Sequence, residues 1–242
     1  KKEKVSTFFR PIKSVTVGNI KQMYDIYASY YENTSLDIFL NDLSKKSGVI
    51  LVTRKSDDKI VGFSTQTFFD IKVDGKRVRG IFSGDTIIEQ AYWGNNALAN
   101  TFYRRLIIER IKRPFTPFYW FLISKGYKTY LLLARNWIHA WPRRDGPTPP
   151  FEARVLRDVS IRLFGDQYDP ERGVVTFDTP MGRVRPGLAE PPPDDPDVRF
   201  FLEHNPRYAD GVELCCLGRL ELSLFLYFAL RQALPFLRAR KR

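Results

Sequence analysis

A stretch near the middle of the chain has the residue types and the spacing of a phosphate-binding corner. Residues 80–97, GIFSGDTIIEQAYWGNNA, predict a strand, a loop and the first turn of a helix. A strand that runs into such a loop presents free backbone N–H groups beside the positive end of the helix. The chemistry that this corner supports is the binding of a phosphate or pyrophosphate group.

A carboxylate ends the predicted strand. Side-chain alternation gives two opposite faces, with Val78, Gly80, Phe82, Gly84, Thr86 and Ile88 on one and Ile81, Ser83, Asp85, Ile87 and Glu89 on the other. A carboxylate at a strand end can act as a general base, directly or through a water molecule. Glu89 is therefore the candidate base. The alternatives for it are a solvated surface carboxylate or an ion pair with a neighbouring arginine.

The composition predicts a folded, basic protein. Of the 242 residues, 43% are hydrophobic and 14% are aromatic, which is typical of a packed core. The net charge of +12 favours acidic partners: a phosphorylated cofactor, nucleic acid, an acidic carrier protein or an anionic membrane. We expect no nucleic-acid partner, because the basic residues follow no known reading motif.

The cysteines and histidines predict neither a metal site nor a disulfide framework. Cys215 and Cys216 are adjacent, without the spacing of zinc ligands, and neither His139 nor His204 has a second histidine or a carboxylate pattern nearby. So few cysteines are typical of a reducing compartment, and no secretory apolar segment is visible. We therefore expect a cytoplasmic protein without a metal.

Hydrophobic periodicity predicts alternating helices and strands over the first part of the chain. The expected elements are a strand at 5–9, helices at about 19–31 and 35–47, strands at 49–53, 60–69 and 78–89, a helix at 96–112, a strand at 118–123 and a helix at 124–137. Asp74 and Gly75 predict a tight hairpin between strands 60–69 and 78–89.

The composition changes after Trp141. A proline-rich crossing at 142–150 precedes an expected helix at 151–164, a strand at 173–178, an irregular acidic loop at 185–197 and an apolar helix at 217–237. Three charged residues interrupt the last helix, so it is not a transmembrane span. The sequence thus predicts a core at residues 1–141 and a helical and irregular C-terminal extension at 142–242 that packs on the core.

The order of elements in residues 15–137 resembles that of the GNAT superfamily of acyltransferases. In that family the loop after the fourth strand has the form Arg/Gln-x-x-Gly-x-Gly/Ala, and its amides hold the pyrophosphate of acyl-CoA. The matching residues here are 91–97, AYWGNNA, in which Gly94 takes the place of the family's glycine. Ala91 stands where the family has a basic or amide residue, and Asn96 stands where a small residue is usual. The resemblance implies an α+β fold with a mixed, mostly antiparallel central sheet flanked by helices.

The resemblance also implies a reaction and a site. It implies an N-acyltransferase that moves an acyl group from acyl-CoA, or from acyl-phosphopantetheine on an acyl carrier protein, to the amine of a small molecule or amino acid. The thioester would lie in the V between strands 78–89 and 118–123. Glu89 would be the base, and Tyr130, in preference to Tyr127, would protonate the leaving thiolate. The expected cofactor contacts are Ile87, Ile88, Trp93, Gly94, Asn95, Asn96 and Ala97.

Two other functions stay open, a catalytically inactive binding protein of the same fold and a basic interaction module at a membrane edge. The basic residues of the helix at 96–112 are expected beside the cofactor loop, where they hold phosphates or a carrier protein or are merely solvated: Arg104, Arg105, Arg110, Lys112 and Arg113. Residues 217–242, apolar and then basic, make peripheral contact with an anionic membrane or pack on the domain. Association of a cytoplasmic protein with a membrane is therefore a further expectation.

Overall fold

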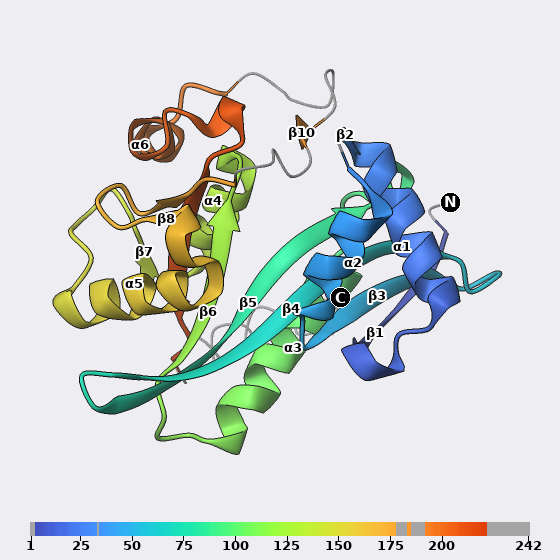
Figure 1. Ribbon diagram of the computed structural model, residues 1–242, viewed down its shortest axis with the longest axis horizontal. Helices are drawn as coiled ribbons and strands as arrows, with labels where there is room; N and C mark the ends of the chain where they lie inside the picture. Colours follow the sequence, from blue (N-terminus) through green and yellow to red (C-terminus); the bar gives the residue numbers. More distant parts are fainter. Residues whose placement is uncertain (1–2, 33, 178–182, 185–191, 222–242) are drawn as a thin grey trace, which may run out of the picture.

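The computed structural model describes residues 3–32, 34–177, 183–184 and 192–221 of the chain. Its centre is a nine-stranded sheet in the order β1-β3-β4-β5-β6-β11-β9-β8, with β7 paired to β11 (Figure 1). Strands β5 and β6 are parallel, and the other neighbours in this sheet are antiparallel. The predicted fold class, α+β with a mixed, mostly antiparallel sheet flanked by helices, is confirmed.

The strands of the central sheet are β1 (Val5–Pro11), β3 (Gly48–Arg54), β4 (Ile60–Val73), β5 (Lys76–Ile88), β6 (Phe118–Ser124), β7 (Ala140–Trp141), β8 (Tyr168–Asp169), β9 (Val174–Val175) and β11 (Glu213–Arg219). A separate pair is formed by β2 (Tyr31–Glu32) and β10 (Arg183–Val184). The α-helices are α1 (Val17–Tyr30), α2 (Leu36–Ser44), α3 (Ala97–Lys112), α4 (Tyr127–Asn136), α5 (Pro150–Phe164) and α6 (Pro196–His204).

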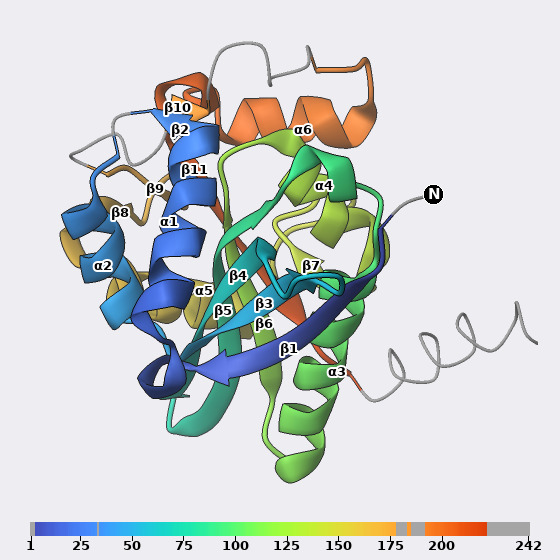
Figure 2. The same ribbon diagram turned by 90° about the vertical axis from the view of Figure 1, so that its right-hand side faces the viewer.

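Helices cover both faces of the sheet. On one face α1 and α2 pack over a buried cluster that includes Met23, Phe39 and Phe63. Further along the same face α5 packs over Phe69, which lies six residues after Phe63 on β4 and so points the same way. On the other face α3 and α4 pack over a cluster that includes Ile81. Figure 2 shows α1 and α2 on one side of the sheet and α3 and α4 on the other.

Local sequence signals account for most element boundaries. The Asp74-Gly75 turn joins β4 and β5, with both residues at positive φ (49° and 74°), as the predicted hairpin requires. Ser35 caps α2 through its side chain. Helix α1 begins at Val17, two residues before the expected start of the helix at about 19, because Thr16 and Asn19 form a reciprocal capping box.

The C-terminal part of the chain adds strands to the same sheet. Strand β11 pairs with β6 over Leu214 to Arg219 and is buried on both faces. The predicted helix at 217–237 is therefore wrong at its beginning, where Leu217 to Arg219 form the end of β11 and the next two residues are not helical. Residues 222–237 lie outside the described residues. A short apolar run fits a buried strand and a buried helix equally well, so periodicity alone does not separate them.

Candidate active site

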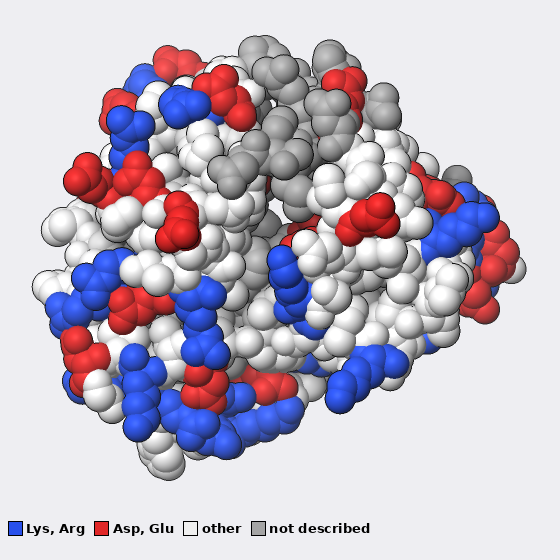
Figure 3. Space-filling view, in the orientation of Figure 1, with Lys and Arg blue, Asp and Glu red and all other residues white. Residues whose placement is uncertain are grey.

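The central sheet opens between its two parallel strands. Ser83 of β5 and Leu122 of β6 form the last pair of the β5–β6 ladder. Beyond it β5 continues to Ile88 beside β4, while β6 continues to Ser124 beside Leu214 of β11. We call the gap between residues 84–88 and residues 123–124 the fork, and it is the V that the resemblance implies. Figure 3 shows the molecular surface hollowed between the two halves of the molecule in this view.

A β-bulge lies where the fork begins. Thr65 of β4 faces two residues of β5, Gly84 and Asp85, because the register shifts by one residue there. Phe82 and Ile87 therefore lie on the same face, Phe82 in the cluster under α5 and Ile87 in the cluster under α1 and α2. The predicted alternation put them on opposite faces and is wrong beyond the bulge. One extra residue moves every later side chain of a strand to the other face.

The bulge also decides which backbone groups of β5 face the fork. The Glu89 amide donates to the Val61 carbonyl at 2.9 Å. Going back along β5 from Glu89, residues whose backbone groups bond to β4 alternate with residues whose backbone groups point away from it. Backbone groups of Ile87 consequently point toward β4, while those of Ile88 point away from β4 and into the fork. Of these two predicted cofactor contacts, only Ile88 presents its amide to the gap.

Two side chains hold the carbonyl group of Ile88. Tyr30 of α1 donates its hydroxyl to this oxygen at 3.1 Å, and Trp93 donates its indole N–H to it at 2.8 Å. The ring of Trp93 is nevertheless exposed. Trp93 thus anchors the loop to the end of β5.

The loop before α3 leaves part of the helix terminus open. Gly94 adopts a φ of +77°, which a glycine tolerates without strain. Asn95 accepts the Ala97 amide through its side-chain oxygen at 2.8 Å, so that amide is occupied. In the described part of the chain, the next two amides, of Leu98 and Ala99, have no acceptor. A helix N-terminus of this kind can receive a phosphate group.

Asp85 is the electrostatic centre of the fork. The pKa of Asp85 is raised to about 6, first by burial and then by the neighbouring carboxylates of Asp42 and Glu213, against the lowering effect of Lys46 and Lys125. Lys46 Nζ lies 2.8 Å from Asp42 Oδ1, and Lys125 Nζ lies 3.4 Å from Glu213 Oε1. Within the described ranges, no hydrogen bond or ion pair reaches the carboxylate of Asp85. The fork thus holds two carboxylates paired with lysines and one that is unpaired.

Tyr27, in the last turn of α1, and Tyr31, directly after the helix, face this group of charges. The pKa of Tyr27 lies well above its usual range, mainly because the side chain is buried and secondly because Asp85 is negatively charged. The same two effects raise the pKa of Tyr31. The Tyr31 ring lies 4.9 Å from that of Tyr27, with Lys125 Nζ 5.4 Å from its centre. Both phenols therefore stay protonated at neutral pH.

Glu89, the predicted base, lies one residue beyond β5. A third of its side chain is exposed (33%), and its Oε1 is 4.0 Å from Lys59 Nζ, so its ionic neighbour is a lysine and not an arginine. Sequence reasoning missed the unpaired Asp85 and named it only as a residue on the face of Glu89. The available signal was Gly84, because a glycine inside a strand often marks a bulge.

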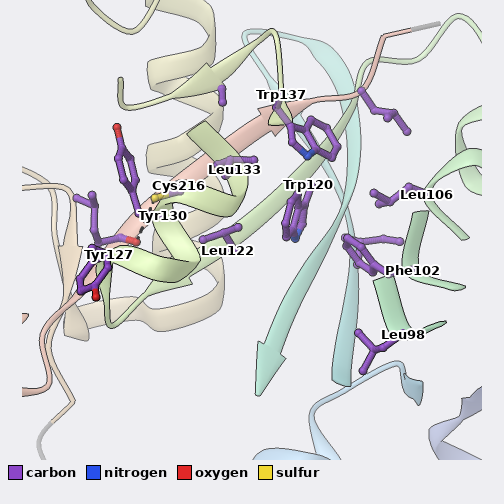
Figure 4. Close-up of a cluster of buried hydrophobic side chains, with 14 of the residues drawn as sticks. Leu98, Phe102, Leu106, Trp120, Leu122, Tyr127, Tyr130, Leu133, Trp137 and Cys216 are labelled. Atoms are coloured by element: carbon purple, nitrogen blue, oxygen red, sulfur yellow. Dashed lines mark hydrogen bonds between the residues drawn. The ribbon is translucent and has the colours of Figure 1, made fainter. Parts of the chain in front are cut away.

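Tyr130, the predicted proton donor, lies in the core on the α3–α4 side of the sheet. Its side chain is 1% exposed, and its hydroxyl donates to the Pro142 carbonyl at 3.2 Å. The ring packs against Phe200 and Phe201 of α6 at centroid distances of 6.0 and 5.7 Å. Figure 4 shows Tyr130 and Tyr127 on the same helix as Leu133. Asp85 faces α1 and α2, so the structure does not bring Tyr130 to it.

The basic residues of α3 do not form the single exposed surface that was expected. The Arg105 guanidinium carbon lies 3.3 Å from the centre of the Phe9 ring, and its Nε donates to Gln66 at 3.2 Å. Lys112 is paired with Glu109 at 2.6 Å. Residues 110–113 lie at the far end of the helix, about 20 Å from the cofactor loop at 1.5 Å per residue. Their predicted position beside that loop is wrong.

The described residues include neither a group of candidate metal ligands nor a helix that could span a membrane. Among them, no three His, Cys, Asp or Glu side chains are grouped as a metal ion would require. None of the described helices is long and apolar enough to cross a membrane.

Comparison with known proteins finds similarity in structure only. No protein-family model and no curated protein sequence matches the chain. Among solved structures, a probable N-acyltransferase from Enterococcus faecalis V583 is 15% identical with a TM-score of 0.41, over 55% of this chain and 32% of that chain. The match spans about a third of that protein's length.

Two smaller proteins match over a larger share of their own length. NAA60 of Arabidopsis thaliana, solved in complex with acetyl-CoA, is 12% identical with a TM-score of 0.40, over 53% of this chain and 83% of that chain. ElaA of Escherichia coli is 13% identical with a TM-score of 0.34, over 54% of this chain and 86% of that chain. The parallel strands β5 and β6, parted beyond Ser83, agree with the splayed pair that the resemblance in the order of elements implies.

Proposed function

We propose that this protein is an N-acyltransferase. The acyl group comes from acyl-CoA, or from acyl-phosphopantetheine on a carrier protein, and goes to the amine of a small molecule or an amino acid. The single observation that carries the proposal is Asp85, an unpaired carboxylate with a raised pKa where β5 and β6 part. A carboxylate of this kind is suited to take a proton from an amine near neutral pH.

The donor would lie in the fork along β5. The amide of Ile88 faces this gap and is the proposed hydrogen-bond donor to the thioester arm. The amides of Leu98 and Ala99, at the positive end of α3, are the proposed contacts of the pyrophosphate. We also propose that residues 93–97 contact the cofactor. They shape the loop before α3, and Trp93 covers the thioester arm of the donor.

The carboxylates divide the proton transfer between them. Asp85 takes one proton of the attacking ammonium group, and the free amine then attacks the thioester carbonyl. As the carbon–sulfur bond breaks, the nitrogen loses a second proton, which balances the proton that the thiolate takes up. Glu89, four residues further along the strand and partly exposed, passes the proton to solvent. The thiolate takes up one proton, for which Tyr130 is the predicted donor and Tyr31 a second candidate because it lies beside Asp85.

The acceptor is proposed to be a cationic amine. Three carboxylates and two lysines gather around the fork, and the one carboxylate without a lysine partner attracts a positive group. A cytoplasmic location is part of the same proposal. It is supported by Cys215 and Cys216, adjacent in β11, which are free and buried on opposite faces of the sheet.

Thermal stabilisation and thiol release together test the proposal. Acyl-CoAs of increasing chain length should raise the melting temperature more than free CoA or free fatty acids do, with an acylated carrier protein as a separate arm. A panel of amines should then support thiol release, and Asp85→Asn should lower kcat/KM by about a hundredfold while the exposed Asp25→Asn leaves it unchanged.

Two results would overturn the proposal. Stabilisation by a donor without thiol release for any amine would favour the catalytically inactive binding protein. If neither donor stabilises the protein and neither supports thiol release, the proposal that this protein is an acyltransferase is wrong. Stabilisation by the carrier-bound donor alone would support the reaction and select the carrier protein as its partner.

A further inference from the structure

The C-terminal end of α3 carries three exposed apolar side chains. Ile108 is 45% exposed, Ile111 57% and Phe115, in the turn that follows the helix, 99%. Ile108 and Ile111 are three residues apart and so lie on one face of the helix. We call Ile108, Ile111 and Phe115 the α3 tip. Grouped apolar exposure of this kind marks an interaction site more often than isolated surface residues do.

Basic side chains surround the α3 tip. Arg104 lies one turn before Ile108, and Lys112 and Arg113 lie between Ile111 and Phe115, all of them exposed. The neighbouring acidic residue, Glu109, is buried and bonded to Arg79 at 3.3 Å and to Lys112 at 2.6 Å. Figure 3 shows Lys and Arg gathered along the lower edge, where Figure 1 places the β4–β5 hairpin and the end of α3. The tip therefore combines an apolar point with a positive rim.

The backbone that presents the tip is held firmly. Arg110 donates its Nε to the Leu220 carbonyl at 3.2 Å and its Nη1 to the carbonyls of Arg113 and Pro114. Arg79 donates to the Glu109 carbonyl at 3.3 Å. These bonds fix the last turn of α3 to β5 and to the end of β11. The apolar side chains project from an ordered structure.

We propose that the α3 tip binds the surface of an anionic lipid bilayer. Phe115 and Ile111 enter the boundary between headgroups and acyl chains, and the basic rim, above all Arg113, contacts the lipid phosphates. Charge complementarity argues for this occupant, since each basic residue near an anionic membrane adds to the attraction. A stable protein partner needs a broad buried area on each side, which a few side chains at the end of one helix do not supply.

The tip is separate from both the fork and the C-terminal segment. It lies about 20 Å along α3 from Ala97, so a bilayer at the tip leaves the cofactor loop free. The contact predicted from sequence for residues 217–242 is a different surface, most of which lies outside the described residues. The proposal is independent of the acyltransferase reaction.

Vesicle flotation with the full chain tests the proposal. The protein should float with vesicles of phosphatidylcholine and phosphatidylserine, less at high salt, and far less with phosphatidylcholine alone. The double variant I111E/F115E should reduce binding about tenfold or more. Val17→Glu, which replaces an apolar residue 83% exposed at the start of α1, is the matched control and should bind as the parent does. Circular dichroism checks that each variant is folded.

A label at the tip separates it from any other membrane-binding segment. Phe115→Cys can carry an environment-sensitive fluorophore selectively, because Cys215 and Cys216 are buried. Its emission should shift to the blue with anionic vesicles and be quenched by a lipid-borne quencher. Absence of binding by the parent, equal binding by I111E/F115E, or an unchanged label in a vesicle-bound protein would each overturn the proposal.

Discussion

Ser83 of β5 lies opposite Leu122 of β6 in the last pair of the only parallel ladder among the described strands, and the candidate site begins there. One residue further, the bulge at Gly84 and Asp85 turns an unpaired carboxylate toward α1 and α2. Because β6 is held by β11 on its other side, it does not follow β5 past this point. The fork is therefore a consequence of strand pairing.

Asp85 should make the protein less stable at high pH than at low pH. Its pKa rises from the ordinary value of 3.8 to about 6 in the folded protein, so folding favours the protonated form. The stabilisation is complete below pH 3.8 and is lost as the pH rises through 6. Asp85→Asn removes the charge and should raise the free energy of unfolding by about 1 kcal/mol at pH 8, with little difference at pH 4. Urea denaturation at the two pH values measures this, and a variant less stable than the parent at pH 8 would contradict it.

Lys46 should set the acidic limb of the pH–rate profile. Lys46 lowers the pKa of Asp85 and pairs with Asp42, whose charge raises that pKa. Lys46→Met should therefore move the acidic limb of kcat/KM upward from about 6 by roughly one pH unit. Lys21→Met, at an exposed position of α1, is the control and should leave the profile unchanged. An unshifted limb in Lys46→Met would separate Asp85 from the observed ionisation.

Gly84 should be required for the close packing of the bulge. A Cβ atom at this position would lie 2.5 Å from Thr65 Oγ1 and 3.3 Å from Lys46 Nζ. Since Thr65 is buried, Gly84→Ala should lower the free energy of unfolding by about 1–3 kcal/mol. Gly146→Ala, where nothing lies within 4 Å of the added carbon, should have a far smaller effect. Equal effects of the two substitutions in chemical denaturation would contradict the packing argument.

Glu89 and Tyr130 test the site predicted from sequence. Glu89→Gln should lower kcat/KM by about tenfold if the side chain passes a proton to solvent. Tyr130→Phe should lower kcat, and it should also cost about 1 kcal/mol of stability, because its hydrogen bond to the Pro142 carbonyl is lost. Steady-state kinetics beside thermal denaturation separates the two effects of Tyr130. If both variants keep full activity, the assignment of these two residues is wrong even if the fold and reaction stand.

Local sequence patterns were sufficient for the order of elements from α1 to α4 and for the turn at Asp74 and Gly75. Each of these signals acts over a few residues: a positive φ at the turn, a cap at Ser35, an apolar period along α3. They also led to strands β5 and β6 as the walls of a site, because the order of elements resembled a known family.

Three features depended on contacts between residues far apart in the chain. The bulge needs β4 beside β5 to define it, and it decides the face of every residue after Gly84. The strand β11 needs β6 as its partner, since an apolar run alone fits a helix as well. Asp85 acquires its raised pKa because folding buries it and, as a second cause, because Asp42 and Glu213, distant in sequence, are brought close to it. Pairing and burial are properties of the assembled sheet, so the tertiary structure decided them.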